Sequence, residues 1–271
     1  AGSEPSTGEG AAEEARPELL QACQDADIVF LTGGLGGGTG TGSLPVIARL
    51  AKERGALTIA IVTLPFSNEG ARRSKNARLG LDKLRKSADT VIVIPNDKLL
   101  QEEIMNLPLN TAFRQADEIL GNAIRCMTEI TSQGGLVNID FADMRSIMDG
   151  GGVAMIGMGE GQGANRATDA VSAALQSPLL ELDIANSEGA LVNVTGGDDM
   201  TLQEAHEVVR EVHSKINKDA RIIWGASIDS TLEHQIRVML VVTGVKSSQI
   251  LGPPSGVDDG MQNKYGIEFV Q

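Results

Sequence analysis

The stretch Gly33-Gly34-Leu35-Gly36-Gly37-Gly38-Thr39-Gly40-Thr41-Gly42 is the most informative part of the chain. It follows the apolar run Ile28–Thr32, which predicts a buried strand, and it precedes a helix expected from about Leu44 to Arg54. Glycines let a backbone approach a ligand without Cβ clashes, and the amides of such a loop point inward. This strand–loop–helix order predicts a cradle for phosphate groups, with a merely flexible loop as the alternative.

The expected helix adds to that cradle. Ser43 is placed to cap it, and Pro45 falls in its first turn, where no N–H is needed. The helix N-terminus contributes about half a positive charge, and the hydroxyls of Thr39 and Thr41 can donate to phosphate oxygens. The loop is not a Walker A loop, because no Gly-Lys-Ser/Thr follows, and it fits the dinucleotide fingerprint poorly.

Strands and helices alternate on both sides of the loop. The region 11–24 predicts a helix, Leu57–Thr63 and Thr90–Ile94 predict further strands, and Glu69–Lys86 predicts a charged helix between them. This alternation indicates parallel strands with right-handed crossovers. In Leu109–Thr131 apolar residues recur at steps of three and four, which predicts one helix of about 33 Å that connects two domains.

The pattern changes after Gly150-Gly151-Gly152. Strand-like and helical runs follow, and the last two strand-like runs are consecutive, which predicts a mixed four-stranded sheet with helices on one face. The strand-like runs are Val153–Gly157, Ala190–Thr195, Arg221–Ile228 and Ile236–Thr243, and the helical runs are Ala164–Gln176 and Leu202–Lys215.

Composition excludes several classes of function. The net charge of -13 and the 3% of aromatic residues disfavour a nucleic-acid-binding protein. Apolar stretches such as Val238–Val242 are too short to insert into a bilayer. Cys23 and Cys126 stand alone, which is typical of a reducing compartment, and no histidine spacing suggests a metal site built by the protein.

Several motifs resemble those of one family, the FtsZ proteins of the tubulin/FtsZ superfamily. The glycine string 36–42 is similar to their signature, and it is accompanied, in the family's order, by four further strings. These are Thr63-Leu64-Pro65-Phe66 with Glu69-Gly70, Ile94-Pro95-Asn96-Asp97-Lys98-Leu99, Gly135-Leu136-Val137-Asn138-Ile139-Asp140-Phe141-Ala142-Asp143, and Ser177-Pro178-Leu179-Leu180. Ile223-Trp224-Gly225-Ala226 and Arg237-Val238 look archaeal rather than bacterial.

The resemblance implies an α/β fold in which a Rossmann-like parallel-sheet GTPase domain is joined by a long central helix to a smaller α+β domain with a mixed four-stranded sheet. The expected division is 1–108, 109–133, 134–245 and, for the linker and tail, 246–271. Ala1-Gly2-Ser3-Glu4-Pro5 resembles the family's third nucleotide loop. The strands and nucleotide loops that precede it in the family are therefore expected to be absent here, which leaves the parallel sheet incomplete with an exposed edge.

The resemblance also implies which residues bind GTP or GDP. Residues of the glycine loop would hold the phosphates: Gly36, Gly37, Gly38, Thr39, Gly40, Thr41 and Gly42. Glu69 and Arg73 would contact the ribose and the polyphosphate, although a solvated ion pair is the alternative for them. Asn96 would contact the nucleoside.

Phe113 and Asp117 lie one helical turn apart at the start of the long helix. A phenyl ring can stack on a purine, and a carboxylate can accept hydrogen bonds from the two N–H groups of guanine that adenine lacks. Phe113 also begins the apolar stripe, so a plain core position is its alternative. The pair predicts a preference for guanine.

Asp140 and Asp143 share one face at an expected helix start, where capping and compensation of the helix dipole are the alternative explanation. In the family this loop enters the nucleotide site of the next subunit. The resemblance therefore implies that both acids, with Asn138, position the attacking water near a γ-phosphate whose Mg²⁺ is held mainly by the phosphates and water. Hydrolysis would then depend on head-to-tail polymerisation.

The resemblance implies a cytoplasmic protein of the mid-cell division ring whose main partner is itself. The string Lys264-Tyr265-Gly266-Ile267-Glu268-Phe269-Val270 is similar to the terminal peptide that engages membrane-anchoring division proteins, and a disordered end is the alternative. Two other hypotheses stay open: a non-catalytic assembly module, because upstream nucleotide loops are missing, and a nicotinamide oxidoreductase, which the poor fingerprint disfavours.

Overall fold

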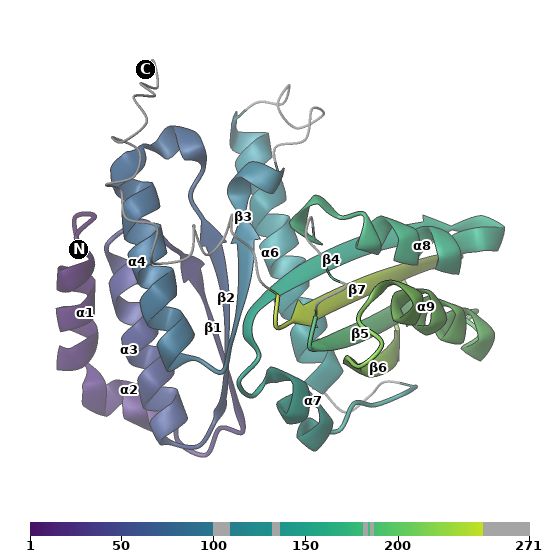
Figure 1. Cartoon of the computed structure of the whole chain (residues 1–271), viewed down its shortest axis with the longest axis horizontal. Coiled ribbons are helices and arrows are strands. Elements are labelled where there is room, and N and C mark those ends of the chain that lie inside the picture. The colour runs from purple at the N-terminus through teal and green to yellow at the C-terminus, as the bar shows by residue number, and fades with distance from the viewer. Residues whose placement is uncertain (100–108, 132–135, 181–183, 185–186, 246–271) are drawn as a thin grey trace, which may run out of the picture.

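The computed structural model describes residues 1–99, 109–131, 136–180, 184 and 187–245 (Figure 1). Its strands form one sheet in the order β1-β2-β3-β4-β7-β5-β6. The sheet has a parallel part and a mixed part, which meet where β3 pairs with β4 over only the three residue pairs from Thr90↔Gly152 to Ile92↔Ala154. The expected α/β fold class is confirmed, and β1 lies at one edge of the sheet.

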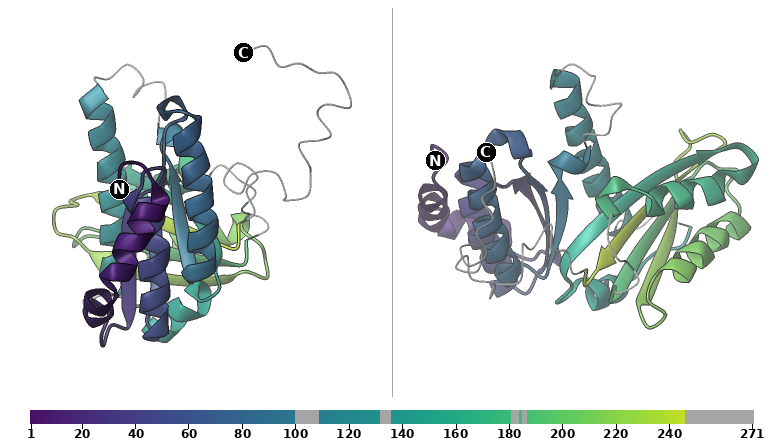
Figure 2. Two further views of the ribbon diagram at one scale, coloured as in Figure 1. Left: turned by 90° about the vertical axis from the view of Figure 1, so that its left-hand side faces the viewer. Right: turned by 45° about the horizontal axis from the view of Figure 1, so that its top comes forward.

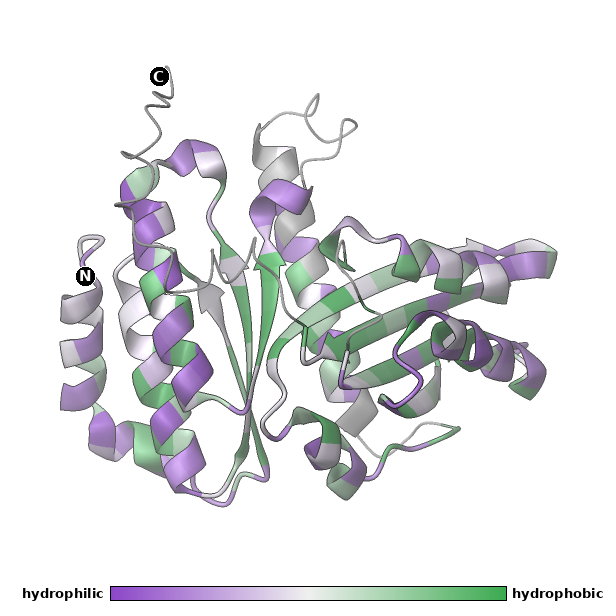
Figure 3. Ribbon diagram, viewed as in Figure 1, coloured by the Kyte–Doolittle hydropathy of each residue, from purple (hydrophilic) through white to green (hydrophobic). Residues whose placement is uncertain are grey.

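The parallel part is built from β1 (Ile28–Gly34), β2 (Leu57–Leu64) and β3 (Thr90–Pro95), all pointing the same way. Helices α3 and α4 cover one face, and α1 and α2 pack outside α3 (Figure 1). Strands β2 and β3 are mostly hydrophobic and buried, as central parallel strands require, whereas the flanking helices mix polar and apolar residues (Figure 3). The helices are α1 (Pro5–Glu14), α2 (Arg16–Ala22), α3 (Thr39–Glu53) and α4 (Ala71–Ser87), with the 3₁₀ turns η1 (Ser67–Glu69) and η2 (Asn96–Leu99).

The mixed part has four strands, as expected from the sequence. β4 and β5 each pair antiparallel with β7, and β6 pairs parallel with β5 at the far edge. Helices α8 and α9 cover one face of this part (Figure 2). The elements are β4 (Gly152–Gln162), β5 (Gly189–Gly196), β6 (Arg221–Ile228), β7 (Gln235–Thr243), α8 (Arg166–Leu175), α9 (Leu202–Lys215), η3 (Gly163–Asn165) and η4 (Pro178–Leu180).

The long helix α6 (Leu109–Thr131) and the short α7 (Phe141–Met148) join the two parts of the sheet. Ala123 and Met127 of α6 and Met144 of α7 are fully buried in a cluster that includes Ile59 of the parallel part and Leu191 of the mixed part. The predicted stripe of α6 is therefore a shared core for both parts. No helix among the described residues has both the length and the hydropathy needed to cross a bilayer.

Two predicted helix boundaries were wrong. The helix expected over 11–24 is two helices, the first of which begins at Pro5. The helix expected from Leu44 begins at Thr39, so Ser43 is not its cap and Pro45 lies inside it. The Ser43 hydroxyl instead donates to the carbonyl of Thr39 at 2.7 Å.

Close packing explains why glycines occupy these helices. A Cβ on Gly42 would lie 2.0 Å from the carbonyl oxygen of Pro5, and one on Gly8 would lie 2.2 Å from the carbonyl oxygen of Gly38. A Cβ on Gly40 would lie 2.3 Å from the carbonyl oxygen of Gly34. The contacts between α1, α3 and β1 therefore offset the low helix propensity of glycine.

A buried arginine at the start of α8 forms ion pairs with two acidic residues near the start of α9. Arg166 has a side chain only 7% exposed, and its guanidinium donates to Glu204 at 2.6 Å and to Asp199 at 2.7 Å. Asp199 also bonds the exposed His234 at 2.9 Å. The hydrogen bonds from Arg166 lower the pKa of Glu204 to about 2 and also lower the pKa of Asp199.

We expect Gly42→Ala to lower the free energy of unfolding by about 1–3 kcal/mol, because its Cβ collides with the backbone of α1. Gly10→Ala is the matched control, since a Cβ there meets nothing within 4 Å. Gly10 is also helical, so the control should raise the free energy of unfolding by about 0.5–1 kcal/mol. Chemical denaturation of both variants measures this, and equal effects of the two changes would contradict the packing argument.

The ion pair of Glu204 predicts a pH dependence. Its folded pKa of about 2 is below the ordinary 4.5, so the stabilisation is complete above about pH 4.5 and is lost as the pH falls toward 2. The free energy of unfolding of the Glu204→Gln variant should therefore decline less steeply across this window than that of the unchanged protein. Glu14→Gln, on the exposed surface of α1, serves as control. Parallel declines in Glu204→Gln and the unchanged protein would contradict the prediction.

Candidate functional site

The three parallel strands end at the same edge of the sheet, which is where ligands bind in folds of this kind. Gly34, Leu64 and Pro95 are the last residues of β1, β2 and β3. The loops that follow carry the glycine string, the Glu69–Arg73 segment and Asn96. The structure therefore places the segments that carry these predicted residues at the carboxyl edge of the parallel part (Figure 1).

The glycine loop is shaped by Thr41. Gly36 has a φ of 106°, and its N–H donates to Thr41 Oγ1 at 2.9 Å. Thr41 is only 2% exposed, so its hydroxyl holds the loop in shape, whereas Thr39 is exposed. A Cβ on Gly37 would meet no atom within 4 Å, which leaves open space above this peptide. The open positions of the cradle are thus Gly37 and Thr39, whereas Gly36 and Gly38 are buried.

Two helices begin next to each other at this loop. Gly38 is the N-cap of α3 and Glu4 is the N-cap of α1, and a Cβ on Gly38 would lie only 2.8 Å from the amide nitrogen of Glu4. Neither cap residue uses its side chain to cap the helix. First-turn amides have no acceptor within their own helix, so both helix dipoles favour an anion at this edge.

Asn76 fastens the two loops together, although no local sequence pattern marks this residue. Its Nδ2 group donates to the carbonyl of Ser3 at 3.2 Å and to that of Gly36 at 3.3 Å. Ser3 has a φ of 62°, an uncommon conformation outside glycine. One turn earlier on α4, Arg72 forms an ion pair with Glu4 at 3.0 Å. Helix α4 thereby holds residues 1–4 against the glycine loop.

Glu69 and Arg73 form the ion pair that was the alternative to a binding role. Glu69 also accepts a hydrogen bond from the Phe66 N–H at 2.9 Å, so its carboxylate is already engaged within its own loop. The Arg73 side chain is 49% exposed at the same edge. Arg73 is thus the more accessible member of the pair.

The side chain of Asn96 has a buried polar atom that a ligand could bond. Its Oδ1 atom is buried and has no hydrogen-bond partner among the described residues. Buried polar atoms are rarely left so, because an unpaired group costs about 1–3 kcal/mol. The neighbouring Asp97 accepts a hydrogen bond from the Ser67 N–H at 2.9 Å and ties the loops after β2 and β3 together. Sequence reasoning assigned no role to Asp97.

The start of α6 supplies the remaining predicted binding residues. Asp117 is exposed in the first part of the helix. Phe113 lies on the same helix, and its side chain falls outside the described residues. The string at 264–270 falls outside them as well.

The predicted acidic residues lie at the opposite, amino-terminal ends of the parallel strands. Asp140 is the N-cap of α7 and accepts a hydrogen bond from the Ala142 N–H at 3.3 Å, while Asp143 lies in the first turn. Asp140 therefore caps the helix, as the alternative explanation for this residue predicted. A pocket of about 310 Å³, lined by Asp27, Ile28, Ile139, Phe141 and Met144, places this segment beside the first residue of β1.

A chain cannot bring its own acids to its own glycine loop. The two groups lie at opposite ends of β1, a strand of 7 residues. A strand of that length spans about 23 Å. Asn138, Asp140 and Asp143 are all exposed, and so are accessible to another molecule.

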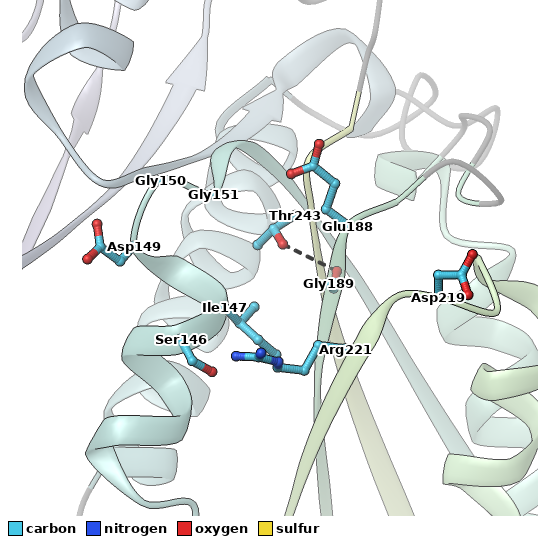
Figure 4. A pocket seen from close by; sticks show the side chains of 10 residues that line it. All are labelled: Ser146, Ile147, Asp149, Gly150, Gly151, Glu188, Gly189, Asp219, Arg221 and Thr243. Atoms are coloured by element: carbon cyan, nitrogen blue, oxygen red, sulfur yellow. Dashed lines mark hydrogen bonds between the residues drawn. The ribbon is translucent and has the colours of Figure 1, made fainter.

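Three other features were considered as functional sites: a second pocket, the thiol of Cys126 and possible metal ligands. A pocket of about 320 Å³ lies between α7 and the starts of β5 and β6, and Figure 4 shows its polar lining, with Asp149, Glu188, Asp219 and Arg221. It contains none of the predicted site residues. Burial raises the pKa of Cys126 to about 11, so it is no nucleophile. The described residues contain no metal-binding cluster of His, Cys, Asp and Glu.

Fold and site together define a class of protein. A parallel sheet with a glycine loop and two helix N-termini at its carboxyl edge, joined through a long helix to a mixed sheet, is the arrangement of a nucleotide-binding protein with a second domain. The sequence model described as "Tubulin/FtsZ family, GTPase domain" matches residues 1–103, and that described as "FtsZ family, C-terminal domain" matches residues 152–246.

The chain belongs to the FtsZ family. It is 54% identical to Cell division protein FtsZ 1 of Archaeoglobus fulgidus over 100% of this chain and 73% of that protein. It is 54% identical to Cell division protein FtsZ of Haloferax mediterranei over 100% of this chain and 72% of that protein. A solved structure titled "FtsZ dimer, empty (M. jannaschii)" superposes with a TM-score of 0.88 at 53% identity, covering 91% of this chain and 71% of that one.

Asn76→Ala should weaken nucleotide binding, because residues 1–4 and the glycine loop lose the amide that joins them. Two lost hydrogen bonds correspond to a loss of about tenfold in affinity. Calorimetric titration with GTP measures the change. Asn122→Ala, half-buried on α6, serves as control and should bind normally. Unchanged affinity of Asn76→Ala would contradict this role.

Proposed function

We propose that the chain binds GTP at the carboxyl edge of its parallel sheet and hydrolyses it only when a second copy supplies the acids of its α7 loop. The observation that carries this proposal is the placement of the two half-sites at opposite ends of the same strands. Membership of a family with a GTPase domain supports the identity of the substrate.

The geometry of the carboxyl edge supports a nucleotide half-site there. The glycine loop from Gly36 to Gly42, at the start of α3, would receive the β- and γ-phosphates, with most of the room at Gly37. The N–H groups of Gly36 and Gly42 are bonded to Thr41 and Gly38, so the amides between them would donate to the phosphates. Arg73 would add a positive charge near the phosphates, and Glu69, once released from that ion pair, would reach the ribose. The unpaired Asn96 amide would bond the nucleoside.

Guanine recognition would fall to the start of α6. The exposed carboxylate of Asp117 would accept from the N1–H and N2–H groups of guanine, and Phe113 would stack on the ring. Adenine presents no such pair of donors and would leave the carboxylate unpaired. A preference for guanine over adenine therefore follows.

The acidic half-site would act on the nucleotide of the neighbouring copy. Asp140 and Asp143 would orient and polarise the attacking water, and Asn138 would help to hold it. Mg²⁺, held by the phosphates and water, would neutralise charge on the transferred phosphoryl group. This division suits phosphoryl transfer, which depends on positioning and on electrostatic stabilisation rather than on a covalent intermediate.

Half-sites at opposite ends of one molecule make a heterologous contact. Such a contact repeats from copy to copy and produces a filament unless the rotation closes a ring. We propose that this filament is the scaffold of the mid-cell division ring in the cytoplasm, and that residues 264–270 engage membrane-anchoring partners. We also propose the division into 1–108, 109–133, 134–245 and 246–271.

Asp140→Asn and Asp143→Asn should each lower the steady-state rate of GTP hydrolysis by about 100-fold or more, because a positioned charged group is lost from the transition state. GTP affinity should be unchanged, because the acids lie at the other edge. The rate of phosphate release per subunit in the unchanged protein should rise with protein concentration.

Asp149→Asn is the matched control, an exposed acid at the other end of α7. Mixing provides a sharper test: Asp140→Asn subunits added to a dilute, fixed amount of unchanged subunits should raise the rate per unchanged subunit, since unchanged loops then meet the intact pockets of the added subunits. A rate per subunit that is independent of concentration would overturn the shared site.

A further inference from the structure

The loop that carries the acids is attached to the free edge of β6. Val137 and Ala226 form an isolated antiparallel bridge, in which the Val137 N–H donates to the Ala226 carbonyl at 3.1 Å and the Ala226 N–H donates to the Val137 carbonyl at 3.1 Å. Val137 directly precedes Asn138 in the chain. The position of Asn138 and Asp140 is therefore tied by main-chain bonds to the mixed part of the sheet.

Only every second residue of β6 can bond a segment at the free edge, because the residues between them bond β5. Arg221 and Asp229 donate their N–H groups to Glu188 and Gly196 on the β5 side. Residues of the other parity, which include Ala226, therefore direct their N–H and carbonyl groups to the free edge. Both edge-facing groups of Ala226 are used by Val137 and neither by β5.

Gly225 gives the loop room to lie against β6. A Cβ on this residue would lie 3.1 Å from the Val137 carbonyl oxygen and 3.1 Å from Cγ1 of Ile139. Ile139, the residue just before Asp140, packs against the core cluster shared by both parts of the sheet. The loop is thus seated on a side-chain-free peptide of β6.

The other end of the acidic segment is held by the parallel part. Arg145 of α7 donates through Nη2 to the carbonyl of Gly55, just before β2, at 2.8 Å. Its guanidinium also lies 5.5 Å from the centre of the Phe141 ring. Asp140 and Asp143 therefore lie between an anchor on the mixed part and an anchor on the parallel part.

We infer that the backbone of Ala226 is a positioning element for hydrolysis: it fixes where the acids project toward the neighbouring subunit. This inference rests on the proposed function. Positioning matters because a displacement of about 1 Å can reduce a rate by about 100-fold. A shift of β6 relative to the parallel part would move the acids without altering the nucleotide half-site.

Ala226→Pro in the intact protein tests this inference, since proline removes the N–H that bonds Val137 and is tolerated on an edge strand. We expect kcat for GTP to fall about tenfold or more, with GTP affinity unchanged. Ala226→Gly keeps the N–H group and should retain the kcat. Ile228→Pro, which has the same parity on the same edge but no bridge to Val137, is the matched control and should retain it too.

Hydrogen exchange of the Val137 and Ala226 amides gives an independent measurement. Both should be protected in the unchanged protein, and Val137 should lose protection in Ala226→Pro while Val192 of β5 stays protected, which shows that the sheet is intact. Unprotected amides in the unchanged protein, or a normal kcat in Ala226→Pro, would overturn the inference. If Asp140→Asn also keeps a normal kcat, the proposed function itself fails.

Discussion

Strand direction is the constraint on which the rest of the molecule depends. Because β1, β2 and β3 are parallel, everything that follows a strand lies at one edge and everything that precedes a strand lies at the other. The glycine loop belongs to the first group, and α7, which precedes β4, belongs to the second. No side-chain rearrangement can move a group from one end of these strands to the other, so the proposed hydrolysis needs two copies to bring the glycine loop and the acids together.

Glycine serves two demands at the carboxyl edge that compete for the same residues. Gly40 and Gly42 are needed because α3 touches β1 and α1 at distances that exclude a Cβ, whereas Gly37 faces open space. The close approach of α1 to α3 also brings a second helix N-terminus to the loop. Packing thus explains most of the glycine signature without a ligand, and it also brings a second helix dipole to the proposed anion site.

Sequence periodicity predicted the strands and α6 well, because buried parallel strands and a continuous apolar stripe are local patterns. It placed the start of α3 at Leu44, since Gly40 and Gly42 look like loop residues until their contacts with β1 and α1 are known. The roles of Asn76 and Asp97 were missed for a similar reason: each acts on a loop distant in sequence. Asp97 lies in a string that sequence analysis singled out, but its contact with the Ser67 N–H is visible only in the structure. The Val137–Ala226 bridge is likewise a purely tertiary contact.

The choice of main-chain bonds for that bridge has a physical consequence. Side chains can change rotamer, whereas a bridge of two main-chain hydrogen bonds fixes both the position along the strand and the direction of the attached peptide. Arg145 fixes the other end of the segment to the parallel part, which also carries the glycine loop. The positions of Asp140 and Asp143 therefore depend on both parts of the sheet. These parts pair over only three residue pairs, between β3 and β4. A small rotation at that narrow junction would change the reach of the acids toward the next subunit while leaving each half-site internally unchanged.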